Sequence, residues 1–588
     1  MSRDVRVAVV GGGISGLTAA LRLSERGYQV TVYEQKPFLG GNLASHKHPD
    51  TGVYHDVYPH MFSNFYVNFW HLVENDLGMR RDMSAKSDFA HRNTVKVLRL
   101  KQEHAMELRD TGSLEGLRSN LFSGVAPPLD MYLWAYSMLD MLAHSFDPQT
   151  QLRDYSISGF VQSRPYATEE IVALHDFVVM VIWSVHADET SASSYRNFLY
   201  HTFGNLSPLV WLLKGSLQQK IIEPLEQKLK RLKCEIRTNA MVTSVKVDGA
   251  SISEIKVEGT TFDWHRHEVN LKRREQDHPD LNPVDSFDYV VLAVPPNTLG
   301  ALIETRAVPM GHRIVDRLPH LAQVRRLDSE PIAVLDLYFK RKVHGIPAEN
   351  TFMIDSGCEL TCIDLSQLWD DPGMKDISAV TLAISDYWAL PSDHAEENRH
   401  AMVKMFHRYV PHFNPGREWG DANSDIDWAR SHYTANKADT LFVNQVGSEA
   451  WRPETHYPAI SNLFFAGDLC RNHIDMATVE AAVTSGLNAA AAIHKVEPLG
   501  KPIEILHLDT YPESAILAMK LLMAPSAYSA KWWLSVADAA TSLASGKPRE
   551  EWSTDVGAML GLPYAYATDW LKTAGSFWGS LFLGGRRE

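Results

Sequence analysis

Three glycines near the N-terminus, Gly11, Gly13 and Gly16, stand in the spacing GxGxxG. Glycine at these positions allows a tight turn, a close approach of the backbone to a pyrophosphate, and close packing of a helix on a strand. Glu34 follows further along, where a carboxylate can accept hydrogen bonds from the hydroxyl groups of a ribose. These residues predict a dinucleotide-binding site. The carboxylate disfavours NADP, because it would repel a 2′-phosphate.

The segments around the glycines predict a βαβ unit that would hold them in place. Residues 5–10 and 30–33 are rich in β-branched residues, as buried parallel strands are, and residues 17–23 have helical periodicity that ends at Gly27. The start of this helix, at Ile14 and Ser15, would offer free N–H groups and the positive end of the helix dipole to phosphate oxygens.

The composition is that of a globular protein. Of 588 residues, 45% are hydrophobic and 22% are charged. There are 57 Lys and Arg against 71 Asp and Glu, which gives a formal net charge of −14. An acidic chain is a poor match for a nucleic-acid backbone, so we expect no nucleic-acid partner. The most apolar stretch, residues 171–185, is interrupted by His175 and Asp176, so we expect no membrane-spanning helix.

The cysteines do not indicate a structural framework. The chain has four of them, at Cys234, Cys358, Cys362 and Cys470, which are too few and too scattered for a disulfide scaffold or a zinc site. A buried strand that begins by Val5 leaves no room for a signal peptide. We therefore expect reduced thiols, no bound metal and a cytoplasmic protein, which could associate peripherally with a membrane.

Gly40 and Gly41 follow Glu34 and carry the first resemblance to a known family. The segment is similar to the E-x5-G-G-R element of the FAD-dependent amine oxidase and phytoene desaturase superfamily, with Asn42 in place of the arginine. That exchange puts one pyrophosphate contact in question. UDP-galactopyranose mutases, which share this flavin fold, are similar at Gly-Gly-Asn.

Two distant segments resemble the same superfamily. Residues 214–216, with the helix after them and residues 236–245, are similar to the element in which a residue at the position of Val242 contacts adenine through its backbone. Residues 464–468 and 480–486 resemble the closing F-A-G-D and M-E-G-A-x-x-S-G motifs, in which the residue matching Asp468 bonds ribityl or phosphate oxygens. The resemblance implies FAD contacts from Gly11, Gly13, Ile14, Ser15, Gly16, Glu34, Gln35, Gly41, Asn42, Val242, Ala293, Gly467, Asp468, Thr478 and Val479.

The resemblance also implies an α/β fold. We expect a Rossmann-like FAD-binding domain of the GR2 flavoprotein type from residues 1–80, 214–300 and 450–500. An α+β substrate-binding domain would come from residues 81–213 and 301–449, and a helical extension from residues 501–588. The charged residues 264–285 are typical of a solvated hairpin tip or an insertion.

The branch of the superfamily is indicated by a few positions. Amine oxidases usually carry a lysine on a substrate-domain strand and a tyrosine before the closing glutamate, where this chain has Val334 and Thr478. Residues 56–62, of the form Asp56-x3-His60-Met61-Phe62, resemble instead a segment of plant-type phytoene and ζ-carotene desaturases and of hydroxysqualene dehydroxylases. Residues 182–191 resemble a second segment of these enzymes, and His186 within them is interpreted as a cap or turn residue.

This resemblance implies an FAD-dependent oxidoreductase that transfers a hydride from a hydrophobic lipid or isoprenoid substrate to flavin N5. His60 is then the candidate catalytic residue, beside the isoalloxazine; a histidine that only satisfies a tight turn is the structural alternative. An amine oxidase that uses O₂ remains open, as do a flavin-dependent isomerase or mutase without net electron flow and a non-enzymatic FAD-bound scaffold.

The C-terminal region is rich in tryptophan. Five of the 15 tryptophans lie there, at positions Trp532, Trp533, Trp552, Trp570 and Trp578, in segments typical of amphipathic helices. A lipid substrate needs a path that avoids water, so we expect residues 511–582 to contact a membrane surface. The alternative is that these residues pack on the protein's own core or in a subunit interface, and an oligomer is open.

Overall fold

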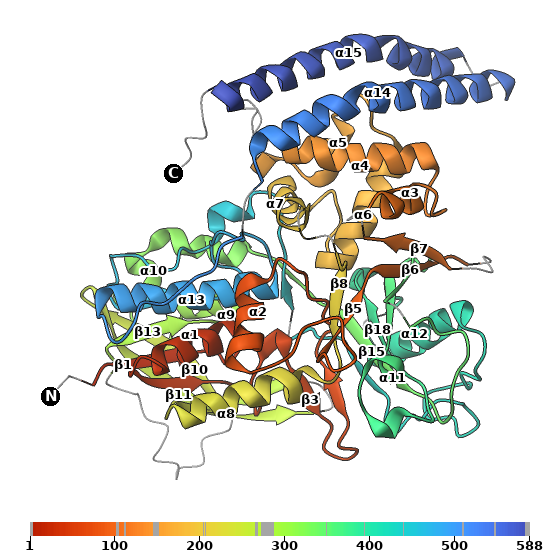
Figure 1. The fold of residues 1–588 in the computed structure, drawn as a ribbon. Coiled ribbons are helices and arrows are strands. Elements are labelled where there is room, and N and C mark those ends of the chain that lie inside the picture. The colour runs from red at the N-terminus through yellow and green to blue at the C-terminus, as the bar shows by residue number, and fades with distance from the viewer. Residues whose placement is uncertain are drawn as a thin grey trace.

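The computed structural model describes residues 4–100, 105–110, 113–144, 152–203, 205, 207–264, 268–271, 287–348, 350–392, 394–438, 440–508, 511–545 and 549–582. Two layered α/β regions lie side by side in the lower part of Figure 1, and a helical region stands above them. The predicted α/β class with a helical C-terminal region is confirmed. The predicted domain boundaries stay a prediction.

The first region contains a five-stranded parallel sheet in the order β21-β13-β1-β2-β9. Its strands come from three distant parts of the chain: β1 (Arg6–Val10), β2 (Gln29–Tyr33), β9 (Glu235–Arg237), β13 (Tyr289–Leu292) and β21 (Leu463–Phe465). The central strands are buried throughout, which explains why they are almost wholly apolar. Helices α1 (Ile14–Ser24) and α13 (Val479–Val496) pack against each other beside this sheet (Figure 1).

A three-stranded antiparallel sheet extends this region. It consists of β10 (Ala240–Asp248), β11 (Ser251–Asp263) and β12 (Glu268–Leu271), with α8 (Glu223–Arg231) and α9 (Pro296–Ile303) nearby in the chain. The pairing of β11 with β12 agrees with the hairpin predicted around residues 264–285. Most of that predicted tip, residues 265–267 and 272–285, lies outside the described residues.

The second region contains a seven-stranded mixed sheet in the order β19-β15-β18-β17-β16-β6-β7. These strands are β19 (His432–Thr434), β15 (Ala333–Tyr338), β18 (Ala379–Ile384), β17 (Leu360–Asp364), β16 (Thr351–Met353), β6 (Thr94–Leu98) and β7 (Met106–Arg109). Short two-stranded sheets pair β3 (Ser45–Lys47) with β4 (Tyr54–Asp56), β5 (Phe89–Arg92) with β8 (Val210–Leu213), and β14 (Ser329–Glu330) with β20 (Leu441–Phe442).

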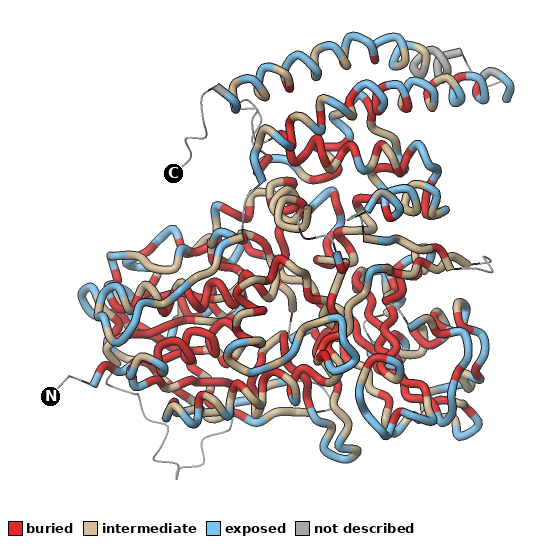
Figure 2. Tube along the Cα trace, in the orientation of Figure 1, coloured by how far each residue is buried: buried red, intermediate tan, exposed pale blue. Residues whose placement is uncertain are grey.

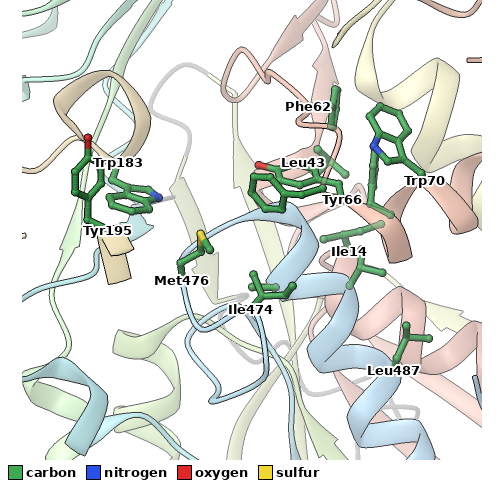
Figure 3. Close-up of a cluster of buried hydrophobic side chains, with 14 of the residues drawn as sticks. Ile14, Leu43, Phe62, Tyr66, Trp70, Trp183, Tyr195, Ile474, Met476 and Leu487 are labelled. Carbon is green, nitrogen blue, oxygen red and sulfur yellow. The ribbon is translucent and has the colours of Figure 1, made fainter. Parts of the chain in front are cut away.

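Helices from the middle of the chain form the upper region. They are α3 (Leu114–Leu121), α4 (Pro128–Ala143), α5 (Ile157–Gln162), α6 (Glu169–Trp183) and α7 (Ala192–Phe203), while α2 (Val67–His71) packs on α13 and α12 (Ala395–Tyr409) on β19. One large apolar cluster joins these helices to the parallel sheet. Figure 3 shows part of it, with Trp183 and Tyr195 on one side and Phe62 and Trp70 on the other.

The C-terminal region forms two long helices, α14 (Glu513–Ala544) and α15 (Arg549–Phe582), which lie side by side (Figure 1). Helix α14 packs on α4, and Ile516 and Leu517 belong to the large apolar cluster. The buried ammonium group of Lys520 lies 2.7 Å from Asp140 of α4 and 2.8 Å from Asp569 of α15. Ion pairs and apolar contacts therefore fix the hairpin to the helical region. Within the described part of the chain, no helix is both long and apolar enough to span a bilayer.

Candidate cofactor and active site

The glycines of the first turn are required by close backbone contacts. Gly11 has φ +106°, and a Cβ there would lie 2.1 Å from the carbonyl oxygen of Ala293. A Cβ on Gly16 would lie 2.1 Å from the carbonyl oxygen of Gly11. A side chain at either position would force the backbone apart. The structure thus brings Gly11, Gly16 and Ala293 together, and their contacts with FAD stay a prediction.

Gly13 differs from its neighbours because space is open beside it. A Cβ on Gly13 would meet only the Cα of Gly41, at 3.9 Å. Gly41 itself has φ +59°. An isolated β-bridge between Gly13 and Gly40 holds the first turn beside this segment. The backbones therefore form a cradle that a Cβ would fill, as a pyrophosphate site requires.

The start of α1 is suited to bind phosphate oxygens. Ile14 begins the helix, and no side chain caps it. The hydroxyl group of Ser15 is buried and has no hydrogen-bond partner among the described residues. Free N–H groups at a helix N-terminus, together with the dipole, favour an anion at this place. The residues present therefore fit the pyrophosphate of FAD.

Glu34 is held at the end of β2 by backbone groups. Its carboxylate accepts hydrogen bonds from the N–H of Gly12 at 2.8 Å and from the N–H of Lys36 at 2.9 Å. The carbonyl of Gln35 accepts a hydrogen bond from the hydroxyl of Thr260 at 2.5 Å. The carbonyl of Glu34 accepts one from the N–H of Ala240 at 2.8 Å, which places the buried Val242 of β10 nearby. Glu34, Gln35 and Val242 thus meet at one end of the cradle.

A buried arginine, Arg452, organises the segment that follows β21. Its guanidinium donates to the carbonyl oxygens of Leu469 at 3.0 Å and Cys470 at 3.1 Å, and to the carboxylate of Asp475 at 2.7 Å. Sequence reasoning missed Arg452, because its partners are mainly backbone carbonyls and no motif marks them. Gly467 has φ +129°. Burial raises the pKa of Asp468 to about 6.

Helix α13 begins where the closing motif predicts. Thr478 is the N-cap residue, and its hydroxyl accepts a hydrogen bond from the N–H of Ala481 at 3.1 Å, so Val479 is the first helical residue. Glu480 is buried and accepts hydrogen bonds from the backbone N–H groups of Asn68 and Phe69, each at 2.9 Å. This contact joins α13 to α2. The sequence resemblance did not identify these partners.

Asn42 and Val334 lie where the two α/β regions meet. The amide of Asn42 donates to the carbonyl oxygen of Thr440 at 3.4 Å. Val334 on β15 is buried in a cluster with Ala44 and Tyr58. The position that the sequence aligns with the lysine of amine oxidases is therefore occupied by a valine in an apolar cluster. Lys340, past the end of β15, is exposed and donates to the carbonyl oxygens of Ala422 and Ser424.

His60 lines a small cavity together with Asp56. Its Nδ1–H donates to the carbonyl oxygen of Tyr58 at 2.9 Å, and burial lowers its pKa to about 4. The imidazole is therefore neutral at pH 7, with Nε2 as an acceptor. The rest of the cavity wall is mostly apolar, with Leu212, Leu213, Leu217, Ile363, Leu365, Leu368, Trp369 and the polar Thr381. The hydrogen bond of Nδ1 agrees with the interpretation of His60 as a histidine of a tight turn. The catalytic role of His60 stays a prediction, because its ring also lines the cavity.

Asp56 has the properties of a proton donor and acceptor near neutral pH. One oxygen of its carboxyl group accepts hydrogen bonds from the hydroxyl of Ser45 and, at 3.4 Å, from the N–H of Leu217. Burial raises its pKa to about 7. Asp56 was part of the D-x3-H segment in the sequence but was not assigned a role. Asp56 and His60 line the same cavity, so each can exchange a proton with a molecule bound there.

A cluster of polar side chains lies next to this cavity. Nδ1 of His55 lies 2.7 Å from one oxygen of Asp336, and the hydroxyl of Thr381 donates to the other oxygen at 2.7 Å. The rings of His55 and His432 pack with their centroids 4.8 Å apart. In the described part of the chain, no group of three or more His, Cys, Asp or Glu side chains is arranged to hold a metal ion.

His186 lies in a turn, as interpreted from the sequence. Its carbonyl oxygen accepts hydrogen bonds from the N–H groups of Glu189 and Thr190. Hydrogen bonds to Asp176 and Asp386 raise the pKa of its imidazole to about 10, so this ring is charged at neutral pH. This half-exposed, charged histidine stabilises the turn through its contacts with Asp176 and Asp386.

The match to a family and to curated relatives covers most of the chain. The model of the family described as flavin containing amine oxidoreductase matches residues 14–494. The 15-cis-phytoene desaturase of Synechococcus elongatus is 22% identical over 518 residues, which cover 83% of this chain and 96% of that protein. The zeta-carotene desaturase of a Synechocystis species is 22% identical over 530 residues, which cover 83% of this chain and 97% of that protein.

Solved structures share the fold. Cyclohexylamine oxidase from Brevibacterium oxydans superposes with a TM-score of 0.54 at 15% identity, over 84% of this chain and 99% of that chain. Wild-type putrescine oxidase superposes with a TM-score of 0.52 at 16% identity, over 84% of this chain and 99% of that chain. Together with the glycine cradle and Glu34, the family match shows that this chain belongs to the flavin-containing amine oxidoreductase family and is an FAD-dependent oxidoreductase.

Proposed function

We propose that the protein dehydrogenates a hydrophobic lipid or isoprenoid substrate. The observation that carries this proposal is the cavity in which Asp56 and the neutral His60 face apolar side chains. A mostly apolar wall with a few polar groups is typical of a site for a hydrophobic ligand. The two desaturases named above, whose names specify carotenoids, support the substrate class.

Different residues of this chain would bind the cofactor and transfer the proton during dehydrogenation. Bound FAD supplies the acceptor for the hydride. The cradle between Gly13 and Gly41 would hold the pyrophosphate, Glu34 would accept hydrogen bonds from the ribose, and the N-terminus of α13 would stabilise negative charge on the flavin. Formation of a double bond also releases a proton from the neighbouring carbon. Nε2 of His60 would accept this proton, because the imidazole is neutral at pH 7.

Asp56 would pass the proton onward. Its raised pKa, about 7, lets it exist in both protonation states near neutral pH. Asp56 and His60 line the same cavity, and most of the side chains beside them are apolar. Proton transfer between groups with suitable pKa values is the usual contribution of such pairs. We expect this step to be slow when either side chain is removed.

Amine oxidation with O₂ is the second function considered, and the fold of cyclohexylamine and putrescine oxidase is the observation that favours it. Val334 and Thr478, at the positions of the lysine and tyrosine of amine oxidases, speak against it. Isomerisation without net electron flow stays open, because Gly40, Gly41 and Asn42 resemble the mutase segment and His60 could serve either reaction.

The experiment begins with identification of small molecules that copurify with the protein. Extraction followed by mass spectrometry would yield a long-chain or polyene lipid under the proposal, and an amine under the alternative. Purified protein is then mixed without oxygen with 15-cis-phytoene in liposomes or with putrescine. Loss of the flavin absorbance with phytoene supports the proposal, while loss with putrescine alone contradicts it. Turnover of a lipid substrate to an isomer of equal mass would indicate isomerisation.

A peripheral membrane contact through the tail is part of the proposal, because a lipid substrate must reach the site without crossing water. Leu522 and Trp533 of α14 are 80% and 62% exposed. Apolar and tryptophan side chains suit the bilayer interface. Flotation with neutral liposomes tests this contact: the native protein should float with the liposomes, and the double variant Leu522→Glu, Trp533→Glu should remain at the bottom of the gradient. Equal flotation of this variant and the native protein would exclude α14 as the contact.

A further inference from the structure

The outward side of α15 carries a regular row of apolar residues. We call this row the α15 seam. Its members are spaced alternately three and four apart: Gly557, Leu560, Tyr564, Ala567, Leu571, Ala574, Trp578 and Leu581. The large side chains among them are strongly exposed, at 71% for Leu560, 80% for Tyr564, 66% for Leu571, 55% for Trp578 and 50% for Leu581. Apolar residues in this spacing form the contact surface of coiled coils.

The opposite side of α15 already has a partner. Leu562 and Thr573 are buried, and Asp569 pairs with Lys520 of α14. In Figure 2 the outer side of α15 is largely in the exposed colour, while α14 below it is buried where it faces α4. The seam is therefore an unpartnered helix face among the described residues, and it is larger than scattered surface apolar residues would explain.

The glycines of α15 indicate what covers this face. Gly557, Gly561, Gly575 and Gly579 all lie inside the helix, where glycine is unfavourable. No heavy atom of the described structure, beyond the local helix backbone, comes within 4 Å of the place where a Cβ on any of them would stand. Nothing among the described residues therefore requires glycine here. A second helix at close range would require it, whereas lipid tails would not.

The charges of the hairpin also favour a protein partner for the α15 seam over a bilayer of anionic lipid. Among the residues of α14 and α15 whose side chains the structure describes, the exposed charged ones are Asp538 and Lys572. Interfacial helices that bind anionic lipid carry a basic face, and a pair of opposite charges does not supply one. A helix with the same apolar seam needs no such charge.

The seam is complementary to itself when two copies run antiparallel about Asp569. Gly557 then meets Leu581, and Tyr564 meets Ala574. Ala567 meets Leu571, so three of the four layers pair a large side chain with a small one, and in the fourth Leu560 meets Trp578. We propose that α15 is a dimerisation helix, which packs antiparallel on α15 of a second copy of this chain. A two-fold interface of this kind uses the same surface on both copies.

The buried area is sufficient for a stable pair. The five large side chains of the seam expose on the order of 600 Å² on each copy, given about 150–250 Å² for a fully exposed large side chain. Two copies would bury roughly 1,200 Å², which is the lower end of the range for stable dimers. Because α15 is tied through Lys520 to α14 and α4, the dimer would join the two helical regions and leave the FAD cradle free.

The first test measures the mass of the FAD-loaded full-length protein in detergent-free buffer by light scattering. The native protein should have twice the chain mass of 66.1 kDa. The double variant Leu560→Glu, Leu571→Glu should have the mass of one chain, because its affinity for a second copy should fall at least 100-fold. Leu522→Glu, an equally exposed position on α14, is the matched control and should remain dimeric. Bound FAD and the melting temperature show that each variant is folded.

The second test determines the orientation of the helices. Leu560→Cys combined with Trp578→Cys should form disulfide-linked dimers on oxidation, because the antiparallel register places these positions opposite each other. Leu560→Cys alone should not cross-link. Cross-linking by the single variant would indicate a parallel pair and overturn the register. A native protein that is monomeric, but floats with liposomes in a manner abolished by Leu571→Glu, would overturn the dimer and assign the seam to a bilayer.

Discussion

The carboxylate of Glu480 and the amide of Asn68 join the two segments that flank the candidate active site. Glu480, at the start of α13, accepts hydrogen bonds from both the backbone and the side-chain N–H groups of Asn68 at 2.9 Å. The side-chain oxygen of Asn68 accepts a third bond from the N–H of Leu506 at 2.8 Å, on the segment that leads to the tail. One buried pair thus connects α13, the segment after His60 and the path to the C-terminal hairpin.

The exchange Glu480→Gln should loosen this connection. The amide of glutamine would turn a donor toward the N–H of Phe69, which now donates to Glu480 at 2.9 Å. A buried donor without an acceptor costs about 1–3 kcal/mol. We expect a melting temperature lower by several degrees and faster proteolysis near residue 68. An unchanged melting temperature would show that the contact contributes little. Glu497→Gln, at the far end of α13, is the control.

Gly13→Val should give a folded protein without FAD. The space next to Gly13 is open, so the valine side chain would take the place of the pyrophosphate. Gly16→Val is the contrasting variant, because its Cβ would collide with the carbonyl oxygen of Gly11, and it should fail to fold. Circular dichroism and flavin absorbance distinguish these outcomes. A Gly13→Val protein that remains yellow would place the cofactor elsewhere, as would Glu34→Ala with full occupancy.

The stability of the protein should fall as the pH rises toward neutrality because of Asp56. Burial raises its pKa to about 7 from the ordinary 3.8, so between these values the unfolded chain releases a proton that the folded chain retains. The charge of Asp336 also raises the pKa of Asp56. Other titratable groups near Asp56 are His55, His60 and Tyr338. The loss is on the order of 4 kcal/mol across this range. Asp56→Asn should flatten the curve of unfolding free energy against pH; an identical slope in both proteins would contradict the assignment.

His60→Asn should slow flavin reduction by the substrate about 100-fold or more, as removal of a general base does. FAD binding should be unaffected, because the hydrogen bond that the ring makes to the described residues is to the carbonyl of Tyr58. Lys340→Met is the control, since Lys340 bonds surface carbonyls, and its reduction rate should equal that of the native protein. Anaerobic stopped-flow absorbance measures both rates. A large loss in Lys340→Met with His60→Asn unchanged would favour the amine oxidase.

Lys520→Met should release the C-terminal hairpin. The ammonium group lies between Asp140 and Asp569 in a buried setting, and its removal leaves two carboxylates near each other. Loss of one partner of a buried ion pair costs about 3–5 kcal/mol. We expect protease cleavage before α14 at low enzyme concentration. Lys572→Met, at an exposed position, should be cut at the native rate, and equal rates in both variants would show that the ion pairs do not hold the hairpin.

The sequence predicted those parts of the site that depend on local geometry. Gly11, Gly16 and Thr478 act through the turn or the helix end in which they stand, so their spacing is sufficient to identify them. Arg452 could not be found in this way, because most of its partners are backbone carbonyls. Asn68 could not, because its partner Glu480 is distant in the sequence. Asp56 was present in a resembling segment, but its raised pKa depends on burial beside Asp336.

The tail shows the same division. Tryptophans and apolar residues in helical spacing predicted amphipathic helices, and the structure has two of them. Which side of each helix is covered depends on contacts such as the pairing of Lys520 with Asp140, which is distant in the sequence. The proposed membrane contact of the tail therefore remains for flotation to decide.

The central claim is that the FAD of this protein oxidises a hydrophobic substrate with His60 as the base. The most direct measurement mixes the FAD-loaded protein anaerobically with a polyene lipid in liposomes and follows the flavin absorbance together with the mass of the lipid. The account predicts loss of flavin absorbance matched by a lipid product lighter by two hydrogen atoms, with both changes about 100-fold or more slower in His60→Asn. Flavin reduction by an amine but not by the lipid, or full lipid oxidation by His60→Asn, would contradict it.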